Sequence, residues 1–156
     1  MTLTKESFHR KIDSLIRSAG FAFICVGPEE GSPGFAYTIG LTETYGCSEL
    51  LIFGVGQQIA DVVFHAVANR IKEGARFKDG DVLVEALNLP CTVKAVSREA
   101  VHLYALNVWS RYEGAPQMPT FQQIVYPDRN GVFPWEAGYE ESMRQIQTEL
   151  WTRKVH

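Results

Sequence analysis

Two short stretches of the chain contain the residue types best suited to catalysis or to recognition. The first extends from Tyr37 to Glu49 and gathers hydroxyl groups and carboxylates around Gly40, where the chain can turn. The second extends from Tyr126 to Glu136 and combines charged residues with aromatic residues, which are common anchors of interfaces. The candidate ligand- or partner-binding residues in these stretches are Tyr37, Thr38, Glu49, Asp128, Arg129, Trp135 and Glu136.

The carboxylates of these stretches suggest acid–base chemistry, provided that two of them meet in one cleft and shift each other's pKa. Glu49 opens a strand that is expected to be rigid and buried, and Asp128 and Glu136 belong to the second stretch. Arg129 and Tyr37 would then bind an anionic substrate. The structural alternative is that Glu49 caps a turn or faces solvent, and that Asp128 forms an Asx turn. The sequence leaves both interpretations open.

Other motifs for catalysis or cofactor binding are incomplete. Gly54-Val55-Gly56 lies between an expected strand and an expected helix, where backbone N–H groups can bind an anion. However, Ile59 stands in place of the third glycine of a dinucleotide fingerprint, so we predict an ordinary turn there. The four histidines have no spacing typical of metal ligands. We therefore expect no metal ion and no cofactor.

The three cysteines show no CxxC spacing and are expected to be reduced thiols in a cytoplasmic protein. Cys25 and Cys91 lie in apolar segments and are predicted to be unreactive core residues. Cys47 lies in a loop, where it would become a nucleophile only with a neighbouring base and a lowered thiol pKa.

The elements that must position these residues form the pattern of a single α+β domain covering residues 1–156. Helical periodicity predicts helices, and short apolar or alternating runs predict strands. The strands occur in adjacent clusters, which favours a mainly antiparallel or mixed sheet of about five to six strands with three to four helices. The expected helices are 5–18, 57–73, 98–112 and 139–153, and the expected strands are 21–26, 35–39, 49–53, 82–87, 91–96 and 121–126.

The second stretch is typical of a tight hairpin bounded by prolines. Asn130-Gly131 is a strong signal for a two-residue hairpin turn, because both residues tolerate positive φ. Pro127 ends the preceding strand, and Val132-Phe133 is expected to return as a short strand.

Composition limits the possible partners. The chain has 156 residues and a formal net charge of −3, and its basic residues are scattered rather than clustered. We therefore expect no nucleic-acid partner. The polar N-terminus lacks the pattern of a secretory signal, and the apolar runs are too short to span a bilayer, so we expect no membrane association.

Three segments of the chain carry a resemblance to a known family: Tyr37-Thr38-Ile39-Gly40-Leu41, Glu49-Leu50 and Tyr126-Pro127-Asp128-Arg129-Asn130-Gly131-Val132-Phe133-Pro134-Trp135-Glu136. Together they resemble the uncharacterised bacterial family called domain of unknown function 4262. The resemblance extends from about Gly20 to Gly138, and implies a small, soluble, single-domain protein without an established activity. The family often has His-Pro before its Glu-Leu pair, whereas this chain has Cys47-Ser48.

Our leading functional hypothesis is a non-enzymatic binding module for a protein partner or a small ligand, which would contact a surface formed by the two stretches. A small hydrolase- or transferase-type enzyme with a carboxylate acid or base is the first alternative. An immunity-like or regulatory partner of another bacterial protein is the second. The sequence does not select among these hypotheses, and it leaves the oligomeric state open.

Overall fold

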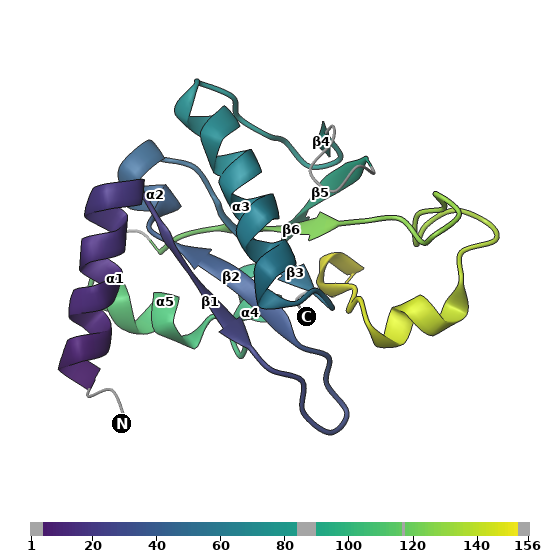
Figure 1. The fold of residues 1–156 in the computed structure, drawn as a ribbon, viewed down its shortest axis with the longest axis horizontal. Helices are drawn as coiled ribbons and strands as arrows, with labels where there is room; N and C mark the ends of the chain where they lie inside the picture. Colours follow the sequence, from purple (N-terminus) through teal and green to yellow (C-terminus); the bar gives the residue numbers. More distant parts are fainter. Residues whose placement is uncertain (1–4, 84–89, 117, 153–156) are drawn as a thin grey trace.

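A six-stranded mixed sheet forms the centre of the molecule in a computed structural model that describes residues 5–83, 90–116 and 118–152 (Figure 1). The strands run in the order β1-β2-β3-β6-β5-β4. Strands β3 and β6 are parallel, and all other neighbours are antiparallel. The predicted α+β fold with a mainly antiparallel or mixed sheet of about five to six strands is therefore confirmed, and the sheet is mixed. The strand bounds are β1 (Ala22–Val26), β2 (Phe35–Ile39), β3 (Glu49–Phe53), β4 (Val82–Leu83), β5 (Cys91–Val96) and β6 (Phe121–Val125).

Helices cover both faces of this sheet. One face packs against α3, whose buried side chains include Val63, Phe64 and Val67. The other face packs against α1, α4 and α5, which contribute Ile12 and Val108 among others. The helices are α1 (Lys5–Ala19), α2 (Leu41–Tyr45), α3 (Gln57–Lys72), α4 (Arg98–Val101) and α5 (Leu106–Arg111), followed by the 3₁₀ helices η1 (Glu141–Gln145) and η2 (Leu150–Thr152).

The continuous apolar run of β3 follows from this two-sided cover. Leu50 and Ile52 point to the α3 face, whereas Leu51 and Phe53 point to the opposite face. A strand that is buried on both faces needs no polar alternation, so the residues of β3 that follow Glu49 can all be apolar. The strand expected over 82–87 is observed as β4 at Val82–Leu83, and residues 84–87 lie outside the described part of the chain.

The prediction of one long helix over residues 98–112 is wrong. Ser97 caps the N-terminus of α4, since its hydroxyl accepts a hydrogen bond from the Ala100 N–H at 3.1 Å. The helix then breaks between α4 and α5, where the ring of Tyr104 packs edge-on against Phe35 and Phe53. Burial of this ring against the sheet outweighs the local helical preference.

The predicted C-terminal helix is also wrong, because side-chain hydrogen bonds between this segment and the β6 end of the sheet replace the backbone bonds of a helix. Gln147 is buried and bonds both the N–H and the C=O of Tyr126, each at 3.0 Å. Gln123 of β6 donates to the Thr148 carbonyl at 2.6 Å and accepts from the Leu150 N–H at 3.2 Å. These contacts hold the segment in two short 3₁₀ turns instead of one continuous helix.

Candidate functional site

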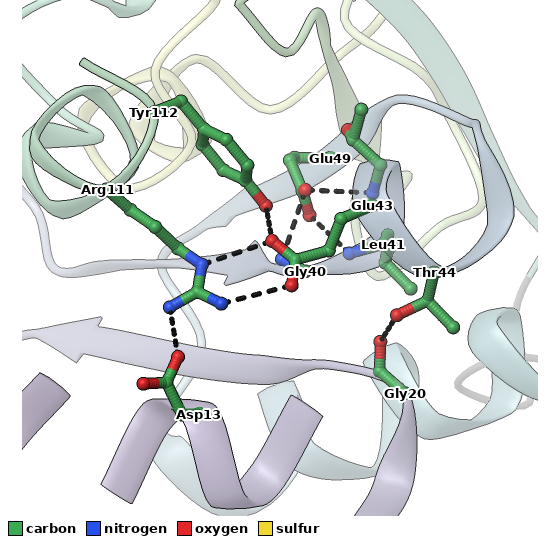
Figure 2. A network of polar contacts seen from close by, with 10 residues as sticks. Asp13, Gly20, Gly40, Leu41, Glu43, Thr44, Glu49, Arg111 and Tyr112 are labelled. Atoms are coloured by element: carbon green, nitrogen blue, oxygen red, sulfur yellow. Dashed lines mark hydrogen bonds and ion pairs between the residues drawn. The ribbon is translucent and has the colours of Figure 1, made fainter. Parts of the chain in front are cut away.

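The Glu49 carboxylate is completely buried at the start of β3, where it organises the N-terminus of α2 (Figure 2). Burial raises the pKa of Glu49, and the hydrogen bonds it accepts oppose that rise. All four of its partners are donors, so the carboxylate is satisfied within the fold. They are the Thr38 hydroxyl at 2.7 Å and the backbone N–H groups of Gly40 at 3.1 Å, Leu41 at 3.2 Å and Thr42 at 3.0 Å.

Thr38 belongs to the same structural unit. Its hydroxyl donates to Glu49 and accepts a hydrogen bond from the Leu50 N–H at 2.8 Å, so the hydroxyl acts as both donor and acceptor within the fold. Thr38 is fully buried as well. Together Thr38 and Glu49 lock the end of β2 to the start of β3.

Asp128 holds the second stretch together from inside. Its side chain is buried and accepts hydrogen bonds from the N–H groups of Asn130 and Val132, both at 2.9 Å, and of Glu140 at 3.0 Å. These backbone donors, Val132 foremost, hold the pKa of Asp128 below its usual range. The predicted Asx turn is confirmed, but Val132 and Phe133 form no strand. The Asp128 carboxylate binds the Val132 N–H that a hairpin ladder would have used.

The remaining candidates of the second stretch lie on the surface. Arg129 is exposed and pairs with Glu140, and Glu136 accepts a hydrogen bond from the Phe133 N–H at 2.9 Å. Trp135 is 50% exposed and stacks on Phe133 with ring centroids 5.0 Å apart. These aromatic rings line a shallow hollow of about 510 Å³ beside β5.

The two stretches do not converge. Glu49 pairs with Phe121 at the beginning of the parallel strands β3 and β6, whereas Asp128 lies beyond Val125 at their far end. The four residue steps from Phe121 to Val125 alone span about 13 Å at a strand rise of about 3.3 Å per residue. Glu49 and Asp128 therefore do not form a pair that could share a proton.

Tyr37 faces a different part of the molecule from its neighbour Thr38, because successive residues of a strand point to opposite faces. Only 1% of Tyr37 is exposed, and its ring stacks with Phe35 at 6.2 Å. The hydroxyl oxygen accepts from the side-chain amide of Asn107 at 3.0 Å and from its backbone N–H at 3.4 Å. Burial raises the pKa of this hydroxyl, so it is a neutral donor at physiological pH.

A cavity of about 650 Å³ opens above Tyr37, between the β1–β2 connection and the α4–α5 segment. Phe35 and Tyr37 are buried at its floor, whereas Glu29 and Glu99 are exposed at its rim. Among the described residues, the lining includes no lysine or arginine. The lining residues are Val26, Gly27, Glu29, Ser32, Phe35, Tyr37, Ser97, Glu99, Ala100, Leu103, Tyr104, Leu106 and Asn107.

An ion network anchors the helix that carries Asn107 (Figure 2). Arg111 of α5 binds both carboxylate oxygens of Glu43, at 3.0 and 3.1 Å, and reaches Asp13 of α1 at 2.7 Å. The Tyr112 hydroxyl also donates to Glu43. The bond with Arg111 lowers the pKa of both carboxyl groups, so the network is charged at neutral pH. No local sequence pattern could predict this network, since Glu43 and Arg111 are 68 residues apart.

Burial and packing account for the properties of the three cysteines and for the glycine at position 54. Cys25 is exposed, contrary to prediction, because it lies on the edge strand β1, beside an open hollow that Gln57 and His65 of α3 also line. Burial raises the pKa of half-buried Cys47, and raises that of Cys91 to about 11, which disfavours the reactive thiolate. A side chain on Gly54 would meet Ile146 and the Tyr126 hydroxyl, so this glycine is required for packing.

A family comparison agrees with the resemblance found in the sequence. The family model described as a domain of unknown function, DUF4262, matches residues 15–140. The chain belongs to the DUF4262 family. The DUF4262 match starts within α1 and includes both stretches, the whole sheet and the cavity lining. No curated protein and no solved structure matches the chain.

No group of three or more histidine, cysteine or acidic side chains is placed to hold a metal ion among the described residues. In the same part of the chain, every helix is too short or too polar to cross a bilayer.

Proposed function

We propose that this protein is a binding module for a small organic ligand, which it holds in the cavity above Tyr37. The observation that carries the proposal is the cavity itself, whose lining includes the buried aromatic residues Phe35 and Tyr37. Small-molecule sites are typically concave, largely apolar and equipped with a few well-placed polar groups. The cavity volume of about 650 Å³ falls in the usual range for such sites.

Binding has more support than acid–base catalysis. The alternative enzyme hypothesis requires two titratable groups that meet in one cleft. Glu49 and Asp128 instead accept hydrogen bonds from the backbone at opposite ends of the β3–β6 pair. Glu29 and Glu99, the carboxylates that do reach the cavity, are exposed at its rim.

A fragment screen with a cavity-filling variant tests the proposal. Ala100→Trp places a large ring in the cavity, whereas Ala137→Trp adds the same ring at an exposed position away from it. We expect fragments that raise the Tm of the wild type and of Ala137→Trp but not that of Ala100→Trp. Amide NMR shifts of the bound protein should map to the cavity lining. Fragments that bind all three proteins equally, or none at all, would remove the support for this function.

A second candidate function, recognition of a protein partner, is favoured by the half-exposed Trp135. Its ring stacks on Phe133 and lies 5.5 Å from the Lys94 ammonium, so it presents a rigid aromatic surface of the kind that dominates interfaces. Cross-linking followed by mass spectrometry can compare the wild type with Trp135→Ala. A partner that is lost with Trp135→Ala and retained with Ala100→Trp would assign the function to this surface instead of the cavity.

A further inference from the structure

We infer that the cavity above Tyr37 selects an organic cation that also carries a carbonyl-type oxygen. The oxygen would accept a hydrogen bond from the Tyr37 hydroxyl at the floor, and the ammonium group would lie between the carboxylates of Glu29 and Glu99 at the rim. This inference rests on the proposed function, because it names the ligand class of the same cavity.

The Tyr37 hydroxyl is a hydrogen-bond donor at the floor of the cavity. Both hydrogen bonds that reach the Tyr37 oxygen come from donors of Asn107. The hydroxyl hydrogen is therefore left to point elsewhere, and within the described residues it has no acceptor. A buried donor without an acceptor costs free energy that a ligand oxygen would recover. This requirement favours a carbonyl or a similar acceptor at the deep end of the ligand.

The rim of the cavity favours a positively charged group on the ligand. Glu29 lies in the β1–β2 connection and Glu99 in α4, so the two carboxylates approach the cavity from different elements. Both side chains are exposed, and the described lining includes no lysine or arginine that would neutralise them. A cleft lined by one sign of charge concentrates ligands of the other sign. An anionic ligand would meet repulsion from these carboxylates without a compensating partner.

The region between floor and rim is suited to an apolar body. Phe35 and Tyr104 contribute aromatic rings, which pack edge to face with centroids 5.2 Å apart. Ala100 and Leu103 supply aliphatic surface from the α4–α5 segment. Aromatic rings also attract ammonium groups through their negative faces. The cavity thus combines a donor at the floor, an apolar middle and an acidic rim.

Three benzamides that differ only in the para substituent separate these contributions. Para-aminomethyl-benzamide carries both recognition groups, unsubstituted benzamide keeps only the carbonyl oxygen, and para-carboxybenzamide reverses the charge. Their dissociation constants are measured by titration calorimetry and by NMR shifts of the cavity residues. We expect the cation to bind about three- to tenfold more tightly than benzamide, because exposed ion pairs contribute modestly. Its advantage should shrink as salt is added, because salt screens exposed charges.

Variants assign these effects to individual residues. Glu29→Gln combined with Glu99→Gln should remove the advantage of the cation and leave benzamide unchanged. Glu30→Gln combined with Glu113→Gln is the control, because it changes the net charge equally at exposed positions outside the cavity. Tyr37→Phe should weaken both the cation and benzamide by about three- to tenfold, the effect of losing one hydrogen bond.

The outcomes distinguish the ligand class from the function itself. If para-carboxybenzamide binds in the cavity as tightly as the cation, the inferred ligand class is wrong while the binding function stands. The same conclusion follows if the rim variant keeps the preference of the wild type for the cation, or if the control pair loses it. If none of the three compounds shifts a cavity resonance and the fragment screen is also negative, the proposed function fails together with the ligand class.

Discussion

The Glu49 carboxylate accepts hydrogen bonds from three successive backbone N–H groups, those of Gly40, Leu41 and Thr42. Glu49→Gln would keep the shape of the side chain but turn an amide N–H₂ group toward backbone donors. We expect this change to lower the free energy of unfolding by about 1–3 kcal/mol, the cost of buried polar groups without partners. Urea denaturation measures the loss. Glu30→Gln, at an exposed position, should unfold like the wild type.

Asp128 makes a pH-dependent contribution to stability. Its pKa is lower in the folded protein than in the unfolded chain because backbone N–H groups bind its charged form. Its contribution is therefore complete above the unfolded pKa of about 3.9 and is lost as the pH falls through the lower folded pKa. We expect Asp128→Asn to lower stability at neutral pH and to reduce the loss on acidification. Urea midpoints between neutral and strongly acidic pH test this, and an unchanged acid slope would contradict it.

The anchoring of α5 to α1 and α2 depends on the contact between Arg111 and Glu43. The pair is bidentate and Arg111 is largely shielded from solvent. We therefore expect the pair to contribute more to the free energy of unfolding than a typical surface ion pair. A double-mutant cycle with Arg111→Gln and Glu43→Gln should give a coupling energy of about 1 kcal/mol. The NMR signals of Asn107 should also shift in both single variants. Fully additive effects would show that the two side chains are energetically independent.

The Gln147 side chain stabilises the irregular C-terminal segment through its hydrogen bonds with the backbone of Tyr126. Gln147→Leu would leave the buried N–H and C=O of Tyr126 without these partners. We expect unfolding to become easier by about 1–3 kcal/mol. Replacing the nearby exposed Gln145 by leucine is the matched control, since its side chain lies outside this contact. Similar losses in both variants would mean that the contact with Tyr126 contributes nothing specific.

Across the whole molecule, stability should be highest at the β3–β6 pair. This parallel pair lies at the centre of the sheet, and helices cover β3 on both faces. Amide hydrogen exchange should therefore be slowest in β3 and β6 and faster in the edge strands β1 and β4, where local opening exposes less buried surface. Exchange measured by NMR or mass spectrometry checks this order. Equal protection of β4 and β3 would contradict the proposed distribution of stability.

Local patterns in the sequence determined much of this molecule. Apolar runs located the strands, and the adjacent clustering of those strands predicted a mixed α+β sheet. Short-range hydrogen bonding also made the Ser97 cap and the Asp128 turn predictable, because each involves residues no more than four positions apart. The two motif stretches were sufficient to identify the family.

The tertiary structure alone decided which side chains face a cavity. Glu49 and Asp128 were attractive candidates in the sequence, yet the fold uses both to satisfy backbone groups. Tyr37 meets Asn107 across 70 residues of chain. Periodicity describes one element at a time, whereas the breaks at Tyr104 and Gln147 arise where packing against the sheet outweighs local preference. Contacts between distant elements therefore made the cavity, and no local pattern could reveal it.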